Sequence, residues 1–483
     1  MNGESPPRVL ACAMFFRTLL AALALAAPAS AQPVSVPDCT VDVAVAKDLK
    51  LDVVYRCRSA TALTFEPDDQ QIAAQVSGYR STKVEPVSGI VEMRYRYDLA
   101  EYARTVNSPS AGIKCGDAVL SPIPGWLLEP RGFDRLPVID IRAQLPDGFS
   151  FATGLPKVGD AWRLAGTRVG FAGYGAIGRF TLEEIAVPAP GSLRPGAPKQ
   201  DGVLRLAMLD GFAKGGTADL VDWVRRTAQA ESNYWQGFTA KQMLVGLVPM
   251  QRPGVGYGRT VSGGGATVMI EVGATVDQRR LFNDWVLVHE LIHTGMPFVR
   301  GRGTWLMEGA ATYIEPIIRA RARWKTEEEV WKEWVDNMPR GVAAFAAGLT
   351  NASGQQNYWA GAAFMLMTDI GIRRATDGAK GLEDCLAGAL WSGLDAPQTV
   401  QVVDYAAACD RAVGVKVMGE LVDRYYRGAA PVDLNALWKE LGVALVGGRI
   451  ALDDSAPSAK WRKMIVMGPP SRPTPHVKLP WES

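Results

Sequence analysis

The chain contains 483 residues, of which 48% are hydrophobic and 21% are charged. This length and apolar content are sufficient for two or three domains, each with its own core. The 52 lysines and arginines nearly balance the 50 aspartates and glutamates. Because nucleic-acid-binding domains carry a basic excess, this balance argues against a nucleic-acid partner.

The first segment, residues 1–31, is typical of a secretory signal peptide. Arg17 precedes an apolar run over residues 18–28, and residues 29–31 read Ala-Ser-Ala, the small-residue pattern that precedes cleavage. Further along, no apolar stretch reaches the roughly twenty residues that a membrane-spanning helix needs. We therefore expect an exported protein, periplasmic or secreted, without stable membrane insertion.

Residues 32–186 have the pattern of a β-rich N-terminal domain. Val91, Met93 and Tyr95 alternate with charged residues, as in a strand with one face in water. Residues 187–202 are rich in proline and glycine, which indicates a linker.

A glycine motif at residues 173–178, Gly-Tyr-Gly-Ala-Ile-Gly, fits the spacing of a dinucleotide-binding loop. That loop needs a strand before it and a helix after it. Here an extended pattern and then the proline-rich segment follow. We expect a glycine-rich hairpin instead.

Beyond the linker, strand patterns at residues 203–208, 243–248 and 267–272 accompany a helical pattern at 218–230. A longer helix is expected at 278–294, and the helical period continues from Trp305, with Thr326 and Glu329 spaced as a capping box. The pattern predicts a multidomain α+β fold. Its expected parts after the N-terminal β domain and linker are an α/β subdomain at 203–312, a C-terminal helical domain at 313–454 and an irregular, proline-rich tail at 455–483.

The most specific motif is His289-Glu290-Leu-Ile-His293. Residues four apart share one helix face, so His289 and His293 can bind the same metal ion. Glu290 is rotated by about 100° from His289 and can reach a water on the ion rather than the ion itself. Only three histidines occur, and two fall in this apolar helix, where unpaired polar groups are costly. The motif predicts one Zn²⁺ ion with Glu290 as general base, whereas His476 is expected to be solvated.

A catalytic zinc site usually has three protein ligands and an open position for water. The first helix is expected to end before Pro297, and Thr304 can cap a second helix, which places Glu308 one turn inside it. Glu308 is therefore the expected third ligand. A third histidine at a metzincin spacing is excluded, because Met296 and Val299 occupy those positions.

Signal cleavage would leave five cysteines in a compartment that permits disulfides, so one would stay unpaired. Cys385 and Cys409 lie in two helical patterns, and a bridge between them would close a helical hairpin. Pairing among Cys39, Cys57 and Cys115 stays open from the sequence.

These residues resemble the gluzincin metallopeptidases, especially the aminopeptidase N and glycyl aminopeptidase families, over residues 203–373. Residues 305–313 match their segment Trp-x-x-Glu-Gly-x-x-x-Tyr, which supplies the third zinc ligand, and Glu315 fits the same pattern. Residues 358–362 match their Tyr-x-x-Gly-Ala segment, whose tyrosine polarises the scissile carbonyl. Tyr358 is the corresponding residue here, with a core tyrosine as the alternative.

The resemblance implies a thermolysin-like zinc subdomain and a zinc peptidase acting on a peptide or protein substrate. One departure concerns the family's Gly-Ala-Met-Glu-Asn motif, which binds a substrate's free amino terminus. Residues 264–267, Gly-Gly-Ala-Thr, stand in its place, and Glu271 lies nearby at another offset. Exopeptidase specificity therefore does not carry over.

Two other functions fit the same residues. Water activated by zinc can attack esters or epoxides as well as amides, so a zinc hydrolase of another bond is an alternative. A secreted binding protein with a structural zinc is another, although a structural site would have no use for Glu290 and is usually closed by four ligands.

Overall fold

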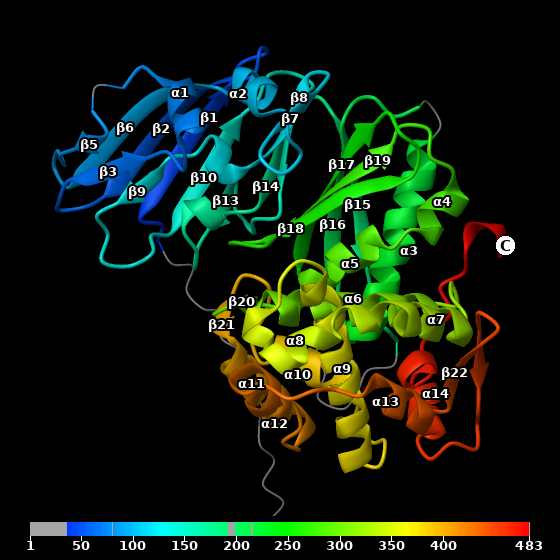
Figure 1. The fold of residues 1–483 in the computed structure, drawn as a ribbon. Helices are drawn as coiled ribbons and strands as arrows, with labels where there is room; N and C mark the ends of the chain where they lie inside the picture. The colour runs from blue at the N-terminus through cyan, green and yellow to red at the C-terminus, as the bar shows by residue number, and fades with distance from the viewer. Residues whose placement is uncertain (1–35, 80, 192–198, 214–215, 483) are drawn as a thin grey trace, which may run out of the picture. The chain divides into compact units, whose positions relative to one another are not determined.

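The computed structural model describes residues 36–79, 81–191, 199–213 and 216–482. The expected signal peptide at residues 1–31 lies outside these residues. Within them the fold is mixed α+β, with strands throughout the first half and helices predominating after residue 278 (Figure 1). None of the helices described combines the length and the apolar character that crossing a bilayer requires.

Three sheets occupy the described chain before residue 181. The largest has the order β12-β13-β10-β1-β2-β6-β4, with β1 Cys39–Val45, β2 Lys50–Arg58, β4 Val76–Ser77, β6 Ile90–Asp98, β10 Ile139–Gln144, β12 Lys157–Val158 and β13 Ala161–Leu164. A second has the order β11-β14-β8-β7, with β7 Ile113–Cys115, β8 Ala118–Pro122, β11 Ser150–Thr153 and β14 Tyr174–Gly178. The third has the order β5-β3-β9, with β3 Leu63–Glu66, β5 Lys83–Val84 and β9 Glu129–Arg131. Two helices accompany them, α1 Gln70–Gln75 and α2 Leu99–Val106.

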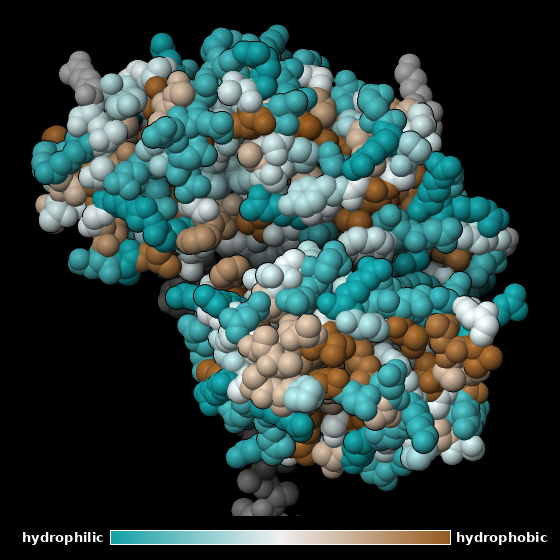
Figure 2. Space-filling view, in the orientation of Figure 1, coloured by the Kyte–Doolittle hydropathy of each residue, from teal (hydrophilic) through white to brown (hydrophobic). Residues whose placement is uncertain are grey.

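The alternation expected around residue 93 is confirmed in β6. Val91, Met93 and Tyr95 are buried, and the charged residues between them are exposed. Figure 2 shows hydrophilic side chains over much of the surface in this view, together with a hydrophobic patch over the helical part. The buried apolar side chains form separate cores in the N-terminal sheets and in the helical part.

A fourth sheet, which lies next to the candidate active site described below, has the order β15-β16-β17-β19-β18. Its strands are β15 Thr181–Val187, β16 Gly202–Met208, β17 Gln242–Met250, β18 Val255–Val261 and β19 Ala266–Gly273. Strands β16, β17 and β19 are parallel, whereas β18 is antiparallel to β19 and forms an edge. The strands expected at 203–208, 243–248 and 267–272 are confirmed, and helix α3 Thr217–Trp235 is longer than expected. Strand β18 was not expected from the sequence, because its two glycines interrupt the alternation.

The hairpin expected at residues 173–178 is wrong. Strand β14 pairs with β11 and β8, whereas β15, which follows it, pairs with β16 in the next sheet. The chain therefore crosses from one sheet to another at this point. No helix follows the glycines, so the dinucleotide-binding geometry is absent from these described residues.

The single helix expected at 278–294 is broken into α4 Gln278–Asn283 and α5 Val286–His293. The break lies at Asp284, whose backbone is extended (φ −80°, ψ 155°). Its carboxylate accepts a hydrogen bond from the backbone N–H of Val286, the first residue of α5, at 2.8 Å, and so gives that N–H the partner it lacks within the helix. A periodic pattern cannot show this break, because the aspartate interrupts the chain without changing the apolar period.

The remaining described chain is mainly helical. Its helices are α6 Thr304–Arg321, α7 Glu327–Asn337, α8 Val342–Ala347, α9 Gln355–Ala375, α10 Leu382–Trp391, α11 Val402–Val413, α12 Met418–Val422, α13 Leu434–Leu441 and α14 Ala459–Met467. Two strand pairs accompany them, β20 Phe298–Arg300 with β21 Thr399–Gln401, and β22 Val443–Val446 with β23 Arg449–Leu452. The capping box of Thr326 and Glu329 is confirmed at the start of α7.

Two expectations for the helical part are wrong. Helix α6 begins at Thr304 itself, and the capping position is Gly303, with no side-chain bond to the helix. The tail is not irregular throughout, because α14 buries Trp461 and Ile465, and Arg462 reaches Glu327 at 2.9 Å. The domain boundaries drawn from the sequence stay predictions.

The bridge expected between Cys385 and Cys409 is confirmed, and it joins α10 to α11. A second bridge joins Cys39 to Cys57, which face each other across β1 and β2. Cys115 is the cysteine without a disulfide among the described residues. The pairing that the sequence left open is thus decided by strand register.

Candidate active site

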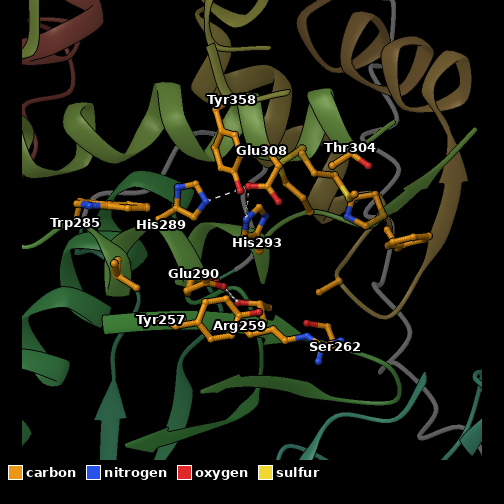
Figure 3. A pocket seen from close by; sticks show the side chains of 18 of the residues that line it. Tyr257, Arg259, Ser262, Trp285, His289, Glu290, His293, Thr304, Glu308 and Tyr358 are labelled. Atoms are coloured by element: carbon orange, nitrogen blue, oxygen red, sulfur yellow. Dashed lines mark hydrogen bonds and ion pairs between the residues drawn. The ribbon is translucent and has the colours of Figure 1, made fainter. Parts of the chain in front are cut away.

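His289, His293 and Glu308 meet at one point in the structure (Figure 3). One potential ligand atom from each lies within 4.8 Å of the others. The Oε2 atom of Glu308 is 3.2 Å from Nε2 of His289 and 3.6 Å from Nε2 of His293. Among the histidine, cysteine and acidic side chains of the described residues, these three form the group whose ligand atoms lie close enough together to hold one metal ion.

Both histidines come from the last two turns of α5, and Glu308 comes from the first turns of α6. The two imidazole rings are nearly perpendicular, with centroids 5.0 Å apart and an interplanar angle of 82°. His289 is buried, and the centroid of its ring lies 5.1 Å from that of Trp285, with the two rings nearly perpendicular. Short, packed helices therefore fix the directions of the ligand atoms.

Helices α6 and α9 approach closely because two glycines meet. A Cβ added to Gly309 would lie 2.2 Å from the Cα of Gly361, and one added to Gly361 would lie 2.0 Å from the carbonyl oxygen of Trp305. Neither helix could come as close with a side chain at these positions. The contact brings Glu308, next to Gly309, and Tyr358, one turn before Gly361, into one cavity.

Charge at the site is organised around Glu308. Burial disfavours its ionised form, but contacts with His289 and His293 outweigh burial and hold its pKa well below the usual range. Burial likewise disfavours the charged form of His293, and the Glu308 carboxylate outweighs it, so the pKa of His293 is raised. The carboxylate is ionised, as metal binding requires.

Glu290 is held by the edge strand. The hydroxyl of Thr260 on β18 lies 2.8 Å from Glu290 Oε2 and 2.7 Å from the Glu290 carbonyl oxygen. Close packing makes this contact feasible, since a Cβ on Gly258 would lie 2.7 Å from Cγ of Glu290. The three residues His289, His293 and Glu308 form a triad. The carboxylate of Glu290 lies beside this triad and is not part of it. Thr260 was not among the residues expected at the site, because nothing in the sequence marks β18 as a strand.

The site opens into a cavity of about 580 Å³. Tyr358 lies on its α9 side, and Tyr257 and Arg259 lie on the β18 side (Figure 3). Burial and the carboxylates of Glu308 and Glu290 raise the pKa of Tyr358, so its phenol keeps the proton. The hydroxyl can therefore donate a hydrogen bond near the triad.

A second cavity of about 820 Å³ shares Trp285, His289 and Tyr358 with the first. Four of its charged side chains form two ion pairs, Glu315 with Arg319 at 2.9 Å and Lys325 with Glu333. Trp285, His289 and Tyr358 thus lie between the two cavities.

Two residues singled out in the sequence lie elsewhere. The Glu271 carboxylate accepts a hydrogen bond from the backbone N–H of Tyr257 at 3.2 Å and is not among the residues that line the cavity. His476 lies 3.1 Å from Glu482 in the tail and takes no part in the triad.

The fold is similar to that of a solved aminopeptidase N family protein, and it surrounds a centre of two histidines and one carboxylate. An aminopeptidase N family protein from Idiomarina loihiensis shares 14% identity with this chain, over 84% of this chain and 78% of that chain, with a TM-score of 0.60. An M1 zinc metallopeptidase from Deinococcus radiodurans shares 13% identity, over 81% and 94% of the two chains, with a TM-score of 0.48. Neither a protein-family model nor a curated protein matches the sequence. The resemblance to aminopeptidase N is thus confirmed at the level of the fold.

Proposed function

We propose that the protein is an exported, zinc-dependent peptidase that hydrolyses peptide bonds with an activated water molecule. The observation that carries the proposal is the meeting of His289, His293 and Glu308 beside Glu290 in an open cavity. A structural metal site would use neither the cavity nor Glu290.

The three side chains fit a single zinc ion by their chemistry. Two imidazole nitrogens and one carboxylate oxygen are a ligand set found in catalytic zinc sites, and such sites leave a position for water. The ligand atoms lie within 4.8 Å of one another, and Glu308 is ionised. When bound, zinc would polarise a water molecule and lower its pKa towards about 7.

The residues around the triad then have separate tasks. Glu290 accepts a proton from the attacking water and returns it to the leaving amine. Thr260 holds the Glu290 carboxylate in place through its 2.8 Å contact. Tyr358 donates its phenolic hydrogen to the oxygen that becomes negative in the transition state. No covalent intermediate with the protein is needed.

The cavity suits a substrate peptide that lies in an extended conformation along β18. An edge strand presents unpaired backbone N–H and C=O groups, which can pair with a peptide chain. Residues 256–260 of this strand line the cavity almost continuously. The proposal of export rests on the signal-like segment at residues 1–31. We assign the catalytic part of the protein to the α/β zinc subdomain at 203–312 and the helical domain at 313–454.

Zinc content and peptide cleavage test the proposal together. We expect the purified protein to contain about one zinc per chain and to cleave members of a peptide library, with activity lost to a chelator and restored by zinc. His293→Ala should lose both zinc and activity, whereas His476→Ala should keep both. Zinc-dependent cleavage of esters but of no peptide would favour a hydrolase of another bond. Unchanged zinc content in His293→Ala would refute the site.

A further inference from the structure

Arg259 is the only lysine or arginine among the described residues that line the cavity. It lies on β18 between Gly258, which packs on Glu290, and Thr260, which holds Glu290. Figure 3 shows its side chain running along the cavity beside Glu290 towards Ser262. A cationic group thus lies at the strand that an extended substrate would follow.

The guanidinium is held in place without being neutralised. Its Nη1 atom donates to the carbonyl oxygen of Ser110 at 2.8 Å, and the Tyr174 hydroxyl donates to the same oxygen at 3.3 Å. No carboxylate within the described ranges forms an ion pair with Arg259, and its side chain is exposed. Because a guanidinium has five N–H donors in a rigid fork, several of them stay available to a ligand.

The acidic groups of the cavity are already engaged. Glu308 contacts both histidines, and Glu290 is held by Thr260. Glu271, on the neighbouring strand β19, accepts from the backbone N–H of Tyr257 and does not itself line the cavity. Arg259 is thus the cationic side chain of the cavity lining, and it favours an anionic group on the part of the substrate that lies against β18.

We propose that Arg259 binds a carboxylate of the substrate and makes the site selective for peptides that are acidic near the cleaved bond. This inference rests on the proposed peptidase function and adds the substrate class to it. Carboxylates match the guanidinium fork, because two parallel N–H···O bonds can form at once. The carboxylate has two sources, an aspartate or glutamate side chain or the free carboxyl terminus of the peptide.

Matched peptides distinguish the two sources. One pair differs only in glutamate against glutamine beside the cleaved bond, and the other differs only in a free against an amidated carboxyl terminus. For each pair, kcat/KM is measured with wild type, Arg259→Gln and Arg259→Lys, and binding is measured separately in zinc-loaded Glu290→Gln. Arg252→Gln is the control, because Arg252 is exposed in the turn before β18, contacts the sulfur of Met250 and does not line the cavity.

We expect wild type to prefer the carboxylate member of one pair by about tenfold, the size of a charge-assisted hydrogen bond in a partly exposed site. Arg259→Gln should remove the preference, whereas Arg252→Gln should keep it. Arg259→Lys should keep part of it, since the charge remains while the fork is lost. Added salt should weaken the preference in wild type.

The results separate this inference from the proposed function. A preference that survives in Arg259→Gln, or equal treatment of both members of each pair, would overturn the role of Arg259 while leaving the peptidase intact. If no peptide is cleaved but binding still shows a carboxylate preference that depends on Arg259, the peptidase function fails and the recognition stands. A role limited to fastening Ser110 would lower thermal stability in Arg259→Gln without changing the preference.

Discussion

The hydroxyl of Thr260 lies 2.8 Å from Oε2 of Glu290, so the edge strand β18 holds the proposed general base directly. The same hydroxyl is 2.7 Å from the carbonyl oxygen of Glu290. Glu290 lies on α5, one residue after His289. The contact therefore ties the sheet to the proposed general base and, through α5, to a proposed metal ligand. Removing the Thr260 hydroxyl should lower the catalytic rate more than it lowers the stability of the fold.

Thr260→Val should test this link. The change keeps the shape of the side chain but removes the hydroxyl, so the Glu290 carboxylate loses a fixed orientation. We expect kcat to fall by about tenfold, in line with the loss of one hydrogen bond to a charged group, with little change in KM. Thr260→Ser is the control and should keep most of the activity. Equal kcat values in wild type and Thr260→Val would show that Thr260 does not position the base.

Glu290→Gln separates the base from the metal ligands. The amide keeps the size of the side chain and can still accept from Thr260, but it cannot take a proton. We expect full zinc content with turnover reduced by about 100- to 10,000-fold, the usual range for a general base. Zinc analysis and single-turnover kinetics measure the two effects. Loss of zinc in this variant would instead make Glu290 a ligand.

The site could be predicted from the sequence further than the fold could. Helical spacing placed His289 and His293 on one face, and the packing of α5 on α6 brings Glu308 to them. The break at Asp284 was missed, because one residue with an extended backbone interrupts a helix without disturbing the apolar period. Strand β18, and with it Thr260 and Arg259, was missed because its glycines serve close packing rather than alternation.

Tyr358→Phe removes the proposed donor to the oxyanion. Loss of one such donor typically lowers kcat by about 100- to 1000-fold. Its aromatic ring lies 6.2 Å from that of His289, and phenylalanine can keep this stacking, so substrate binding should change little. Steady-state kinetics on one peptide distinguish the roles. An unchanged kcat with a raised KM would make Tyr358 a binding residue.

Asp284→Ala should destabilise the protein through the start of α5. The Asp284 carboxylate accepts from the N–H of Val286, the first residue of α5, and loss of one such hydrogen bond costs about 1 kcal/mol. Chemical denaturation measures the change in unfolding free energy. Asp284→Asn is the matched control, because the amide oxygen of asparagine can accept the same hydrogen bond from Val286. If both variants unfold like wild type, this hydrogen bond does not stabilise α5.

Cleavage should not require a free amino terminus on the substrate. Residues 264–267 lack the acidic motif that binds a terminal ammonium group, and the structure directs Glu271 to the N–H of Tyr257 rather than into the cavity. An ammonium group without a carboxylate partner gains nothing from a partly dry site. We expect acetylated and free peptides of the same sequence to have kcat/KM values within about threefold of each other, a difference well under the 1.4 kcal/mol that a factor of ten represents. Cleavage of the free peptides alone, abolished by Glu271→Gln, would show that Glu271 swings into the cavity and anchors the amine.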